Sequence, residues 1–375
     1  MSFVINGLGT AHPPEYVTPE EGLGVARFLA GPDVRTSTWL GPVYAHSGAD
    51  RRYLVLAGPV IDDVLGSTNH TGSPFLPAPE RDNVGPTTAE RMQIYAAEAG
   101  PLAVRAAKVA LSESRFPAAT ITHLVTVSCT GFVAPGVDLA LITGLGLKPT
   151  VQRTHVGFMG CHGALNGLRV ANAFATADPE ARVLLCAVEL CGLHYHFGNT
   201  ADKLIANAIF ADGAAAVVGK SSGDGEYQLS TGRPKPWLMA ASGSCLIPGT
   251  SAEMGWTVGN HGFEMSLSRK VPGSIAANLR PWLETWLGDN DLSLGDIQSW
   301  AIHPGGPKIL VAVEESLGLS SDAMAPSRSV FADYGNMSSP TVLFILERLR
   351  KTNAPRPCVA LGFGPGLVVE GAIFV

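Results

Sequence analysis

Cys161 is the residue of this chain best placed to act as a covalent nucleophile. It lies in GFMGCHG (157–163), where glycines crowd the point at which an extended segment turns into a helix. A thiol presented at such a turn can attack a carbonyl carbon, and a helix N-terminus favours its reactive thiolate form. The alternative for a free cysteine is a small buried side chain that packs beneath the helix.

Two further side chains could stabilise negative charge on an oxygen. His303 follows an apolar strand and precedes a Pro/Gly turn in AIHPGGPK (301–308). Its imidazole could keep Cys161 ionised or donate a hydrogen bond to a carbonyl oxygen. Asn336 precedes an apolar helix in DYGNMSSP (333–340), and its amide could be a second donor. The alternatives are a histidine bonded to its own loop and an N-cap asparagine.

The elements that must position these residues alternate between helix and strand. Apolar residues at helical spacing predict a helix over 87–112, with a threonine at its start, and a helical pattern over 261–287 that is broken near Pro272. Short apolar runs predict buried strands. The remaining predicted elements are helices at 163–177 and 338–351, strands at 124–129, 182–190, 214–219 and 300–303, a closing hairpin of 359–362 with 367–375, and a surface loop at 65–86.

The predicted elements repeat with a nearly constant register. Cys129, at a strand end, lies 32 residues before Cys161, and His303, at a strand end, lies 33 residues before Asn336. This spacing indicates an internal duplication, although any α/β chain shows some repetition. A polar, turn-rich stretch at 221–236 is the expected seam. We therefore predict an N-terminal half of residues 1–225 and a C-terminal half of residues 226–375.

Composition indicates a large core, which a subunit interface could enlarge further. The chain has 375 residues, of which 46% are hydrophobic and 15% charged, and a net charge of −6, so nucleic acid is not an expected partner. The N-terminus does not read as a signal peptide, and no apolar run approaches the length of a membrane span. The six cysteines form no CxxC pair, which is typical of free thiols. A cytoplasmic location away from membranes is expected.

Taken together, these motifs resemble those of the type III polyketide synthases, the chalcone synthase superfamily. The resemblance rests on Cys161, His303 and Asn336 in one order, and it runs over most of the chain. The supporting segments are APGVD (134–138), Glu189, FADGAA (210–215), VP (271–272), GNMSSPTVLF (335–344) and GFGPG (362–366). Cys129 is common in bacterial members, including alkylpyrone and alkylresorcinol synthases.

This resemblance implies a fold and a reaction. The fold is α/β, a five-layered αβαβα sandwich of the thiolase type, made of two pseudo-repeated halves in a homodimer. Cys161 would take an acyl starter from coenzyme A, while His303 and Asn336 bind malonyl-CoA and help its decarboxylation. The resulting enolate would attack the acyl-Cys thioester, repeatedly, until the chain cyclises to a pyrone or phenolic product. Coenzyme A thioesters are the substrates, and no metal or other cofactor is expected.

The resemblance also implies the residues of a substrate cavity. Phe210 matches a gatekeeper phenylalanine, whereas Met265 stands where the second gatekeeper is expected and Phe263 lies two residues away. Ala206 suggests room for a long or bulky starter. The other expected cavity residues are Cys129, His194, Ser338, Gly364 and Pro365.

Binding of the coenzyme A phosphates is expected from a local basic patch, because the chain is acidic overall. The N-terminal basic residues that plant members of the family use to bind coenzyme A phosphates are mostly absent from this chain, and only Arg51 and Arg52 lie in that region. The other candidates are Lys203, Arg269, Lys270, Lys308 and the loop glycines Gly305 and Gly306.

Three alternatives remain open. A ketoacyl synthase III performs one condensation in fatty-acid synthesis with Cys, His and Asn. A cysteine hydrolase of the papain type would use Asn336 to orient His303 and would never release CO2 from malonyl-CoA. A metal-binding protein would use the C-x2-H-x-H spacing of Cys191, His194 and His196, although no fourth ligand is evident.

Overall fold

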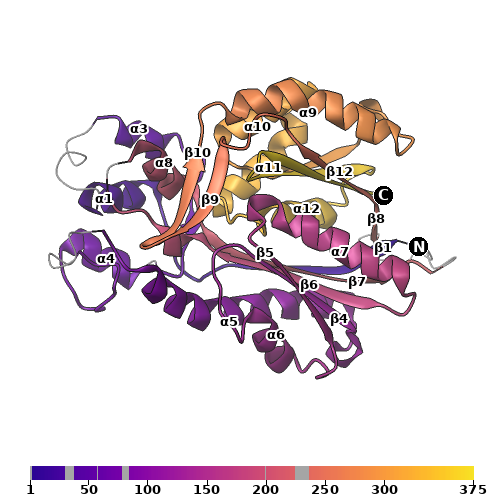
Figure 1. The fold of residues 1–375 in the computed structure, drawn as a ribbon, viewed down its shortest axis with the longest axis horizontal. Coiled ribbons are helices and arrows are strands. Elements are labelled where there is room, and N and C mark those ends of the chain that lie inside the picture. The colour runs from indigo at the N-terminus through magenta and orange to yellow at the C-terminus, as the bar shows by residue number, and fades with distance from the viewer. Residues whose placement is uncertain (1, 30–37, 57, 78–83, 199, 224–235) are drawn as a thin grey trace.

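The computed structural model describes residues 2–375 except 30–37, 57, 78–83, 199 and 224–235. Two sheet portions and three helical layers stack in the order helix, sheet, helix, sheet, helix (Figure 1). The sheets are built from β1(Phe3–Ala11), β4(His123–Ser128), β5(Gln152–Gly157), β6(Arg182–Leu190) and β7(Asp212–Ser221), and from β8(Trp237–Leu246), β11(Ser299–Ile302), β12(Cys358–Gly364) and β13(Val368–Phe374). The central helices are α7(Gly163–Ala177) and α12(Thr341–Lys351), and the outer ones are α5(Thr88–Ser114) and α6(Val137–Leu145) on one side and α9(Val271–Gly288) and α10(Pro307–Leu317) on the other.

The two sheet portions share one topology. The strand order is β11-β12-β13-β8-β1-β7-β6-β4-β5. In the N-terminal portion β1 pairs antiparallel with β7, β7 pairs antiparallel with β6, and β6 pairs parallel with β4. In the C-terminal portion β8 pairs antiparallel with β13, β13 pairs antiparallel with β12, and β12 pairs parallel with β11. β5 has no counterpart. A short β1–β8 pairing joins the portions. The thiolase-like fold is confirmed, whereas the boundary predicted at 225/226 falls outside the described residues.

The sequence explains the placement of the central elements. The Thr87 side chain accepts a hydrogen bond from the Glu90 amide, and Glu90 accepts one from the Thr87 amide, so a capping box starts α5 where predicted. β6 is buried along almost its whole length because helices cover both of its faces. α7 is rich in small residues; a Cβ on Gly167 would lie 2.8 Å from Val127 and Leu185. Small side chains thus let α7 fit between the sheets.

The helical pattern predicted over 261–287 was wrong in its first part. Met254–Gly259 (β9) and Gly262–Leu267 (β10) form an antiparallel hairpin, and α9 starts only at Val271. Pro272 lies in the first turn of α9, where its missing N–H costs nothing, rather than at a break. The predicted hairpin of 359–362 with 367–375 is confirmed as β12 and β13.

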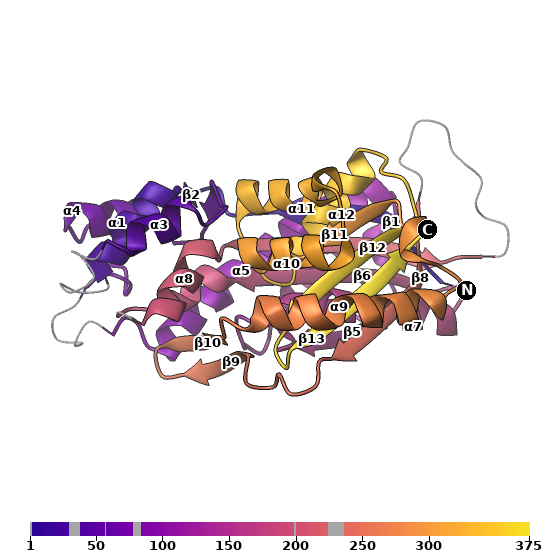
Figure 2. The same ribbon diagram turned by 90° about the horizontal axis from the view of Figure 1, so that it is seen from above.

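A wing of helices extends from one end of the sandwich (Figure 2). It packs over the loop that follows β6 and lies beside the β9–β10 hairpin. None of the described helices is long and apolar enough to cross a membrane. The wing consists of α1(Pro19–Leu29), α3(Leu40–Ala45), α4(Pro59–Gly66) and α8(Ala201–Ile209). The remaining elements are α11(Ser321–Tyr334), β2(Tyr16–Val17), β3(Arg52–Tyr53) and 3₁₀ turns at Ala118–Thr120, Gly160–His162, Cys191–His194 and Leu294–Asp296.

Candidate active site

Cys161 lies in a sharp turn between β5 and α7. A single 3₁₀ turn, Gly160–His162, presents the cysteine two residues before Gly163, the first residue of α7. The bend uses positive φ angles at Phe158 (60°) and Gly160 (76°). A Cβ on Gly160 would lie 2.5 Å from Pro365 Cδ, so the turn packs against the loop between β12 and β13. The predicted strand–turn–helix arrangement is present.

His303 follows β11 and is fully buried. Its backbone N–H donates to the carbonyl of Leu361 at 2.8 Å, which fixes the end of the strand. Neither ring nitrogen of His303 has a hydrogen-bond partner within the described part of the chain. Buried polar groups are nearly always paired, so an unpaired imidazole is typical of a group kept for a ligand.

Asn336 is held by the end of α8. Its backbone N–H donates to Ile209 O and its carbonyl accepts from Ala211 N–H, both at 2.8 Å. The Ser338 amide donates to Asn336 Oδ1 at 2.8 Å, which determines which way the side-chain amide faces. The remaining atom, Nδ2, is a buried donor without a partner among the described residues.

The charge states of the pair differ from the sequence expectation. Burial raises the pKa of Cys161 to about 11, against weaker lowering by the polar side chains of Ser338 and Asn336 close by. Burial, with His162 nearby, lowers the pKa of His303 to about 3. Both groups are therefore neutral at pH 7. A resting thiolate–imidazolium pair is not supported, because loss of hydration outweighs the helix N-terminus.

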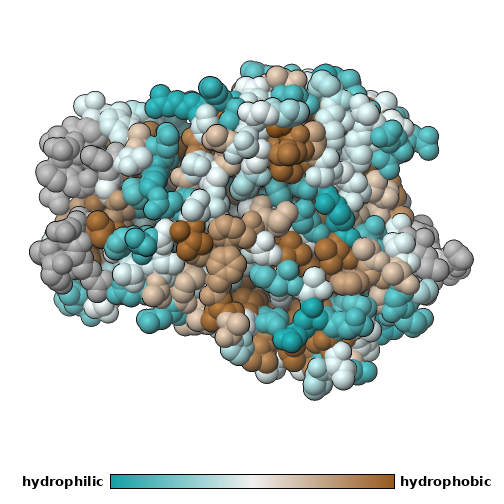
Figure 3. Space-filling view, viewed as in Figure 1, coloured by the Kyte–Doolittle hydropathy of each residue, from teal (hydrophilic) through white to brown (hydrophobic). Residues whose placement is uncertain are grey.

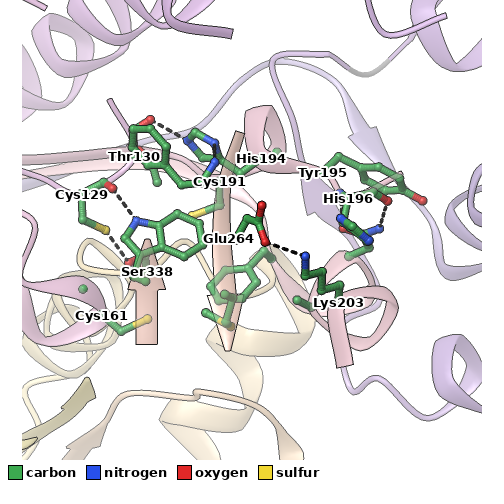
Figure 4. Close-up of a pocket in the computed structure, with 18 of the residues that line it drawn as sticks. Cys129, Thr130, Cys161, Cys191, His194, Tyr195, His196, Lys203, Glu264 and Ser338 are labelled. Atoms are coloured by element: carbon green, nitrogen blue, oxygen red, sulfur yellow. Dashed lines mark hydrogen bonds and ion pairs between the residues drawn. The ribbon is translucent and has the colours of Figure 1, made fainter. Parts of the chain in front are cut away.

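A cavity of about 240 Å³ extends from Cys161. Figure 4 shows Cys161 at one end and Tyr195 and His196 at the other. His303, Asn336 and Gly364 do not line it and are buried. Gly364 lies against His162, where a Cβ would be 2.3 Å from the ring. The predicted residues that do line the cavity are Cys129, Cys161, His194, Ala206, Phe210, Phe263, Met265, Ser338 and Pro365, joined by Arg52 and Lys203.

The buried carboxylate of Glu189 links two segments of the cavity wall by hydrogen bonds. Glu189, at the end of β6, accepts hydrogen bonds from the Cys129 amide and from the hydroxyls of Thr130 and Ser339. It thereby connects the end of β4 to the segment that carries Asn336. The sequence marked Glu189 as part of a motif, but its partners come from distant segments and could not be predicted.

His194 is a fixed part of the cavity wall. Its Nδ1 accepts from the Phe263 amide at 2.9 Å, so its Nε2 carries the proton and donates to Thr130 O at 2.7 Å. The ring stacks on Phe263, with centroids 4.2 Å apart. Burial lowers the pKa of His194 to about 3. Both nitrogens are occupied, which argues against the alternative of a metal site with Cys191.

Trp256 and Cys129 complete this wall, and sequence reasoning missed the tryptophan. Trp256 Nε1 donates to the Cys129 carbonyl at 2.7 Å. The Cys129 thiol lies 3.5 Å from the Ser338 hydroxyl, and burial raises its pKa well above the usual value. Ser338 has a positive φ of 58°, a strained conformation of the kind that clusters at functional sites. Trp256, Cys129 and Ser338 lie far apart in the sequence, so the sequence alone could not show that they share one wall of the cavity.

The basic candidates do not form one patch in the cavity. Arg52 is only 3% exposed and donates to the carbonyls of Asn207 and Phe210, so it stabilises the end of α8. Lys203 pairs with Glu264 at 2.7 Å. Neither thus presents a free cation at the cavity wall. The other basic candidates, Arg51, Arg269, Lys270 and Lys308, are exposed and lie outside the cavity lining, as do Gly305 and Gly306 of the turn before α10.

Comparison with known proteins identifies relatives over the whole chain. The models of the chalcone and stilbene synthases match at residues 78–222 for the N-terminal domain and 238–375 for the C-terminal domain. An alpha-pyrone synthesis polyketide synthase-like protein, Pks18 of Mycobacterium tuberculosis, is 38% identical over 292 residues, 77% of this chain and 73% of Pks18. Bisdemethoxycurcumin synthase of Oryza sativa subsp. japonica is 33% identical over 386 residues, 98% of this chain and 90% of the relative.

Solved structures agree with the sequence relatives. A structure of PKS-I from the brown alga Ectocarpus siliculosus superposes with a TM-score of 0.90 at 32% identity, covering 100% of this chain and 98% of that one. Two family models, relatives above 30% identity and a shared fold lead to one conclusion. The chain belongs to the chalcone and stilbene synthase family, the type III polyketide synthases.

Proposed function

We propose that the chain joins an acyl-CoA starter to several malonyl-CoA units by decarboxylative condensation and then cyclises the product to a pyrone or a phenol. Cys161 holds the starter and the growing chain as a thioester. His303 and Asn336 bind the malonyl thioester carbonyl and stabilise the enolate that forms when CO2 leaves. The observation that carries the proposal is that buried polar groups of His303 and Asn336 have no hydrogen-bond partner among the described residues, next to a cysteine that lines the cavity.

The chemistry follows from these donors. Loss of CO2 places negative charge on the thioester oxygen, and a neutral imidazole and an amide can both donate to it without being desolvated first. For the loading step, the neutral Cys161 thiol loses its proton as it attacks the starter thioester and coenzyme A leaves, and we assign to His303 the passage of that proton to the departing thiolate, so that the site stays neutral. The reaction then needs no metal or redox cofactor, and we expect full activity in EDTA.

Three variants test the assignment. Cys161→Ala should abolish product formation yet retain CO2 release from malonyl-CoA, because the enolate-forming donors remain. His303→Ala and Asn336→Ala should each lower CO2 release about 10²–10³-fold. Radiolabelled malonyl-CoA measures release, and mass spectrometry measures products. Chain extension by Cys161→Ala, or wild-type CO2 release by both donor variants, would overturn the roles.

The same assays separate the alternatives. A ketoacyl synthase III would add one unit and stop, whereas we expect several units on one starter. A hydrolase would release the free acid of an acyl-CoA and no CO2 from malonyl-CoA. The matching family models at both halves favour iterative condensation.

We also propose a homodimer in the cytoplasm. Apolar side chains gather across one face (Figure 3), and Phe132, Val133, Leu139 and Met159 are 39–50% exposed near the open edge strand β5. A second copy would cover them. All six cysteines are free, in keeping with a reducing compartment. Sedimentation should give a dimer, and Leu139→Glu should give a monomer; a wild-type monomer would contradict the proposal.

A further inference from the structure

The turn that carries Cys161 starts with a backbone conformation that bulky residues rarely adopt. Phe158, three residues before Cys161, has a positive φ of 60°. For a residue with a large side chain this left-handed conformation is strained, and it persists where the surrounding structure holds it in place. One restraint is the Phe158 amide, which donates to Ser128 O at 3.1 Å. A second restraint comes from the Phe158 ring.

Three phenylalanine rings from three segments meet beside this turn, and we name Phe132, Phe158 and Phe263 the ring cluster. The ring centroids of Phe132 and Phe158 lie 5.3 Å apart, those of Phe132 and Phe263 5.8 Å, and those of Phe158 and Phe263 5.9 Å. These distances fall in the range of about 4.5–7 Å in which tilted and edge-to-face rings attract one another. Phe132 follows β4, Phe158 follows β5 and Phe263 belongs to β10, so the ring cluster joins two neighbouring strand ends to the hairpin.

The ring of Phe263 is held by the cavity wall. Phe263 is 4% exposed, and its amide donates to His194 Nδ1 at 2.9 Å. Its ring stacks on His194, with centroids 4.2 Å apart, and lies edge-to-face with Trp256 at 5.9 Å. The imidazole is itself fixed, because its Nε2 donates to Thr130 O. Phe263 is therefore a fixed surface against which Phe158 packs.

The segment that carries Phe132 is anchored as well. Trp256 Nε1 donates to the Cys129 carbonyl, and Gly131 lies against the Tyr95 ring, where a Cβ would be 2.3 Å from Cγ. The Phe132 ring is 50% exposed, so it closes the ring cluster from the outside. Phe158 thus packs between two rings whose segments are held by other parts of the molecule.

Beyond Phe158 the turn has a second support. A Cβ on Gly160 would lie 2.5 Å from Pro365 Cδ, so the turn rests there against the loop between β12 and β13. Met159, between the two supports, is 39% exposed and is not part of the ring cluster. Phe158 does not line the cavity. Its effect on the reaction must therefore act through the position of Cys161.

We propose that Phe158 is a positioning residue for the nucleophile. By packing between Phe132 and Phe263, its ring holds the turn so that the Cys161 thiol faces the cavity, and this sets the rate at which the starter is loaded. The inference rests on the proposed function, because it presumes that an acyl starter is transferred from coenzyme A to Cys161.

The chemistry separates this role from that of the two donors. His303 follows β11 and Asn336 precedes α12, so neither belongs to the turn. Release of CO2 from malonyl-CoA uses these donors, whereas loading needs the thiol within reach of the starter carbonyl. A misplacement of about 1 Å at a reacting group can lower a rate about 10²-fold. Loss of the Phe158 ring should therefore slow loading and spare CO2 release.

Phe158→Ala tests this separation. The starter is the acyl-CoA that wild type loads fastest among acetyl-CoA, hexanoyl-CoA and tetradecanoyl-CoA, and mass spectrometry follows the acyl-enzyme in a single turnover. We expect loading to slow at least about tenfold, while CO2 release from radiolabelled malonyl-CoA alone stays within about twofold of wild type. Wild-type loading, or an equal loss in both assays, overturns the proposal.

Matched variants separate the ring from the backbone. Phe158→Gly relieves the strain of a positive φ but lacks the ring, so it should load as slowly as Phe158→Ala. Phe158→Tyr keeps the ring and should load within about threefold of wild type. Met159→Ala, in the same turn but outside the ring cluster, should load within about twofold. Wild-type loading by Phe158→Gly, or equal losses in Met159→Ala and Phe158→Ala, contradicts the assignment.

A variant outside the turn covers the case in which Phe158→Ala does not fold. If circular dichroism shows that it is unfolded, Phe132→Ala replaces it, because this half-exposed ring can be removed without changing the turn itself. Phe132→Ala should slow loading at least about threefold and spare CO2 release, with sedimentation showing the same oligomeric state as wild type. Unchanged loading in this variant overturns the proposal. Absence of loading by wild type with every starter would instead overturn the proposed function.

Discussion

At the scale of the residue, desolvation decides the state of the nucleophile. A helix N-terminus stabilises a nearby anion by about 0.3–1 kcal/mol, and by up to about 2 kcal/mol in partly buried sites. Burial at Cys161 acts the other way and raises its pKa to about 11. His303 cannot compensate as a cation, because burial lowers its own pKa to about 3. The site therefore rests neutral and forms charge only when substrate arrives.

This state predicts the pH dependence of alkylation. Because the pKa of Cys161 is about 11, its thiolate fraction grows about tenfold per pH unit below that value. The rate of iodoacetamide labelling at Cys161 should rise in this way from pH 7 to pH 9, as measured by peptide mass spectrometry. Cys161→Ser is the control for labelling at other thiols. A plateau below pH 8 would mean that a thiolate–imidazolium pair exists at rest.

The identity of the three groups could be predicted from the sequence, but their charge could not. Cys161, His303 and Asn336 stand in local motifs, so residue type and spacing sufficed. Their pKa values depend on what covers them, which comes from segments distant in sequence. The orientation of Asn336 likewise depends on a bond to the Ser338 amide, which strained backbone at Ser338 makes possible.

At the scale of the element, Glu189 joins two segments that the site needs in register. Glu189→Ala would leave the Cys129 amide and the hydroxyls of Thr130 and Ser339 without their acceptor. We expect a loss of about 3 kcal/mol in the free energy of unfolding, since each buried unsatisfied group costs about 1–3 kcal/mol. Glu189→Gln keeps one acceptor oxygen and should lose less. Urea unfolding measures both, and equal losses would show that the network contributes little.

The start of α5 gives a second prediction at this scale. The Thr87 side chain accepts from the Glu90 amide, so Thr87→Ala removes the cap and should lower the free energy of unfolding by about 1 kcal/mol. Thr87→Ser retains the oxygen and should stay close to wild type. Thermal or urea unfolding of the two variants compares them directly. Equal stability of both variants would show that the capping hydrogen bond is not what stabilises this helix end.

The type of an element could be predicted where its hydrophobic pattern is long, and the prediction failed where the pattern is short. The 27 residues of α5 carry a clear start signal and helical spacing. β10 has only six residues, in which Phe263 and Met265 are buried or half-buried whereas Glu264 and Ser266 are exposed. That alternation has period two, but a strong helical pattern follows directly after it. The helix signal of α9 therefore extended the prediction backwards over the hairpin.

At the scale of the whole molecule, the repeated register has a structural cause. Cys129 follows β4 and Cys161 precedes α7, whereas His303 follows β11 and Asn336 precedes α12. α7 and α12 form the central layer between the two sheet portions (Figure 1). The spacing predicts that both helix starts face one site. The helical wing has no counterpart among the described residues of the other half, so the repeat could not predict the cavity's far wall.

Buried titratable groups make the stability of the whole fold depend on pH. His194 has a folded pKa of about 3 and an ordinary unfolded pKa of about 6.5, so acid favours the unfolded state. Its contribution is complete above pH 6.5 and is progressively lost as the pH falls toward 3. Asp212 acts in the opposite direction, because burial raises its folded pKa to about 7 from an unfolded value near 3.9. Its contribution grows as the pH falls from 7 toward 4.

Two variants should therefore change the pH dependence with opposite signs. Between pH 7 and pH 5, His194 loses and Asp212 gains roughly 2 kcal/mol each. His194→Gln should make the drop in unfolding free energy on acidification smaller by about that amount. Asp212→Asn, which keeps an acceptor for the amides of Val55 and Gly192, should make the drop larger. Urea unfolding at both pH values measures the difference for each protein. Equal pH dependence in wild type and both variants would show that neither group changes its protonation on unfolding in this range.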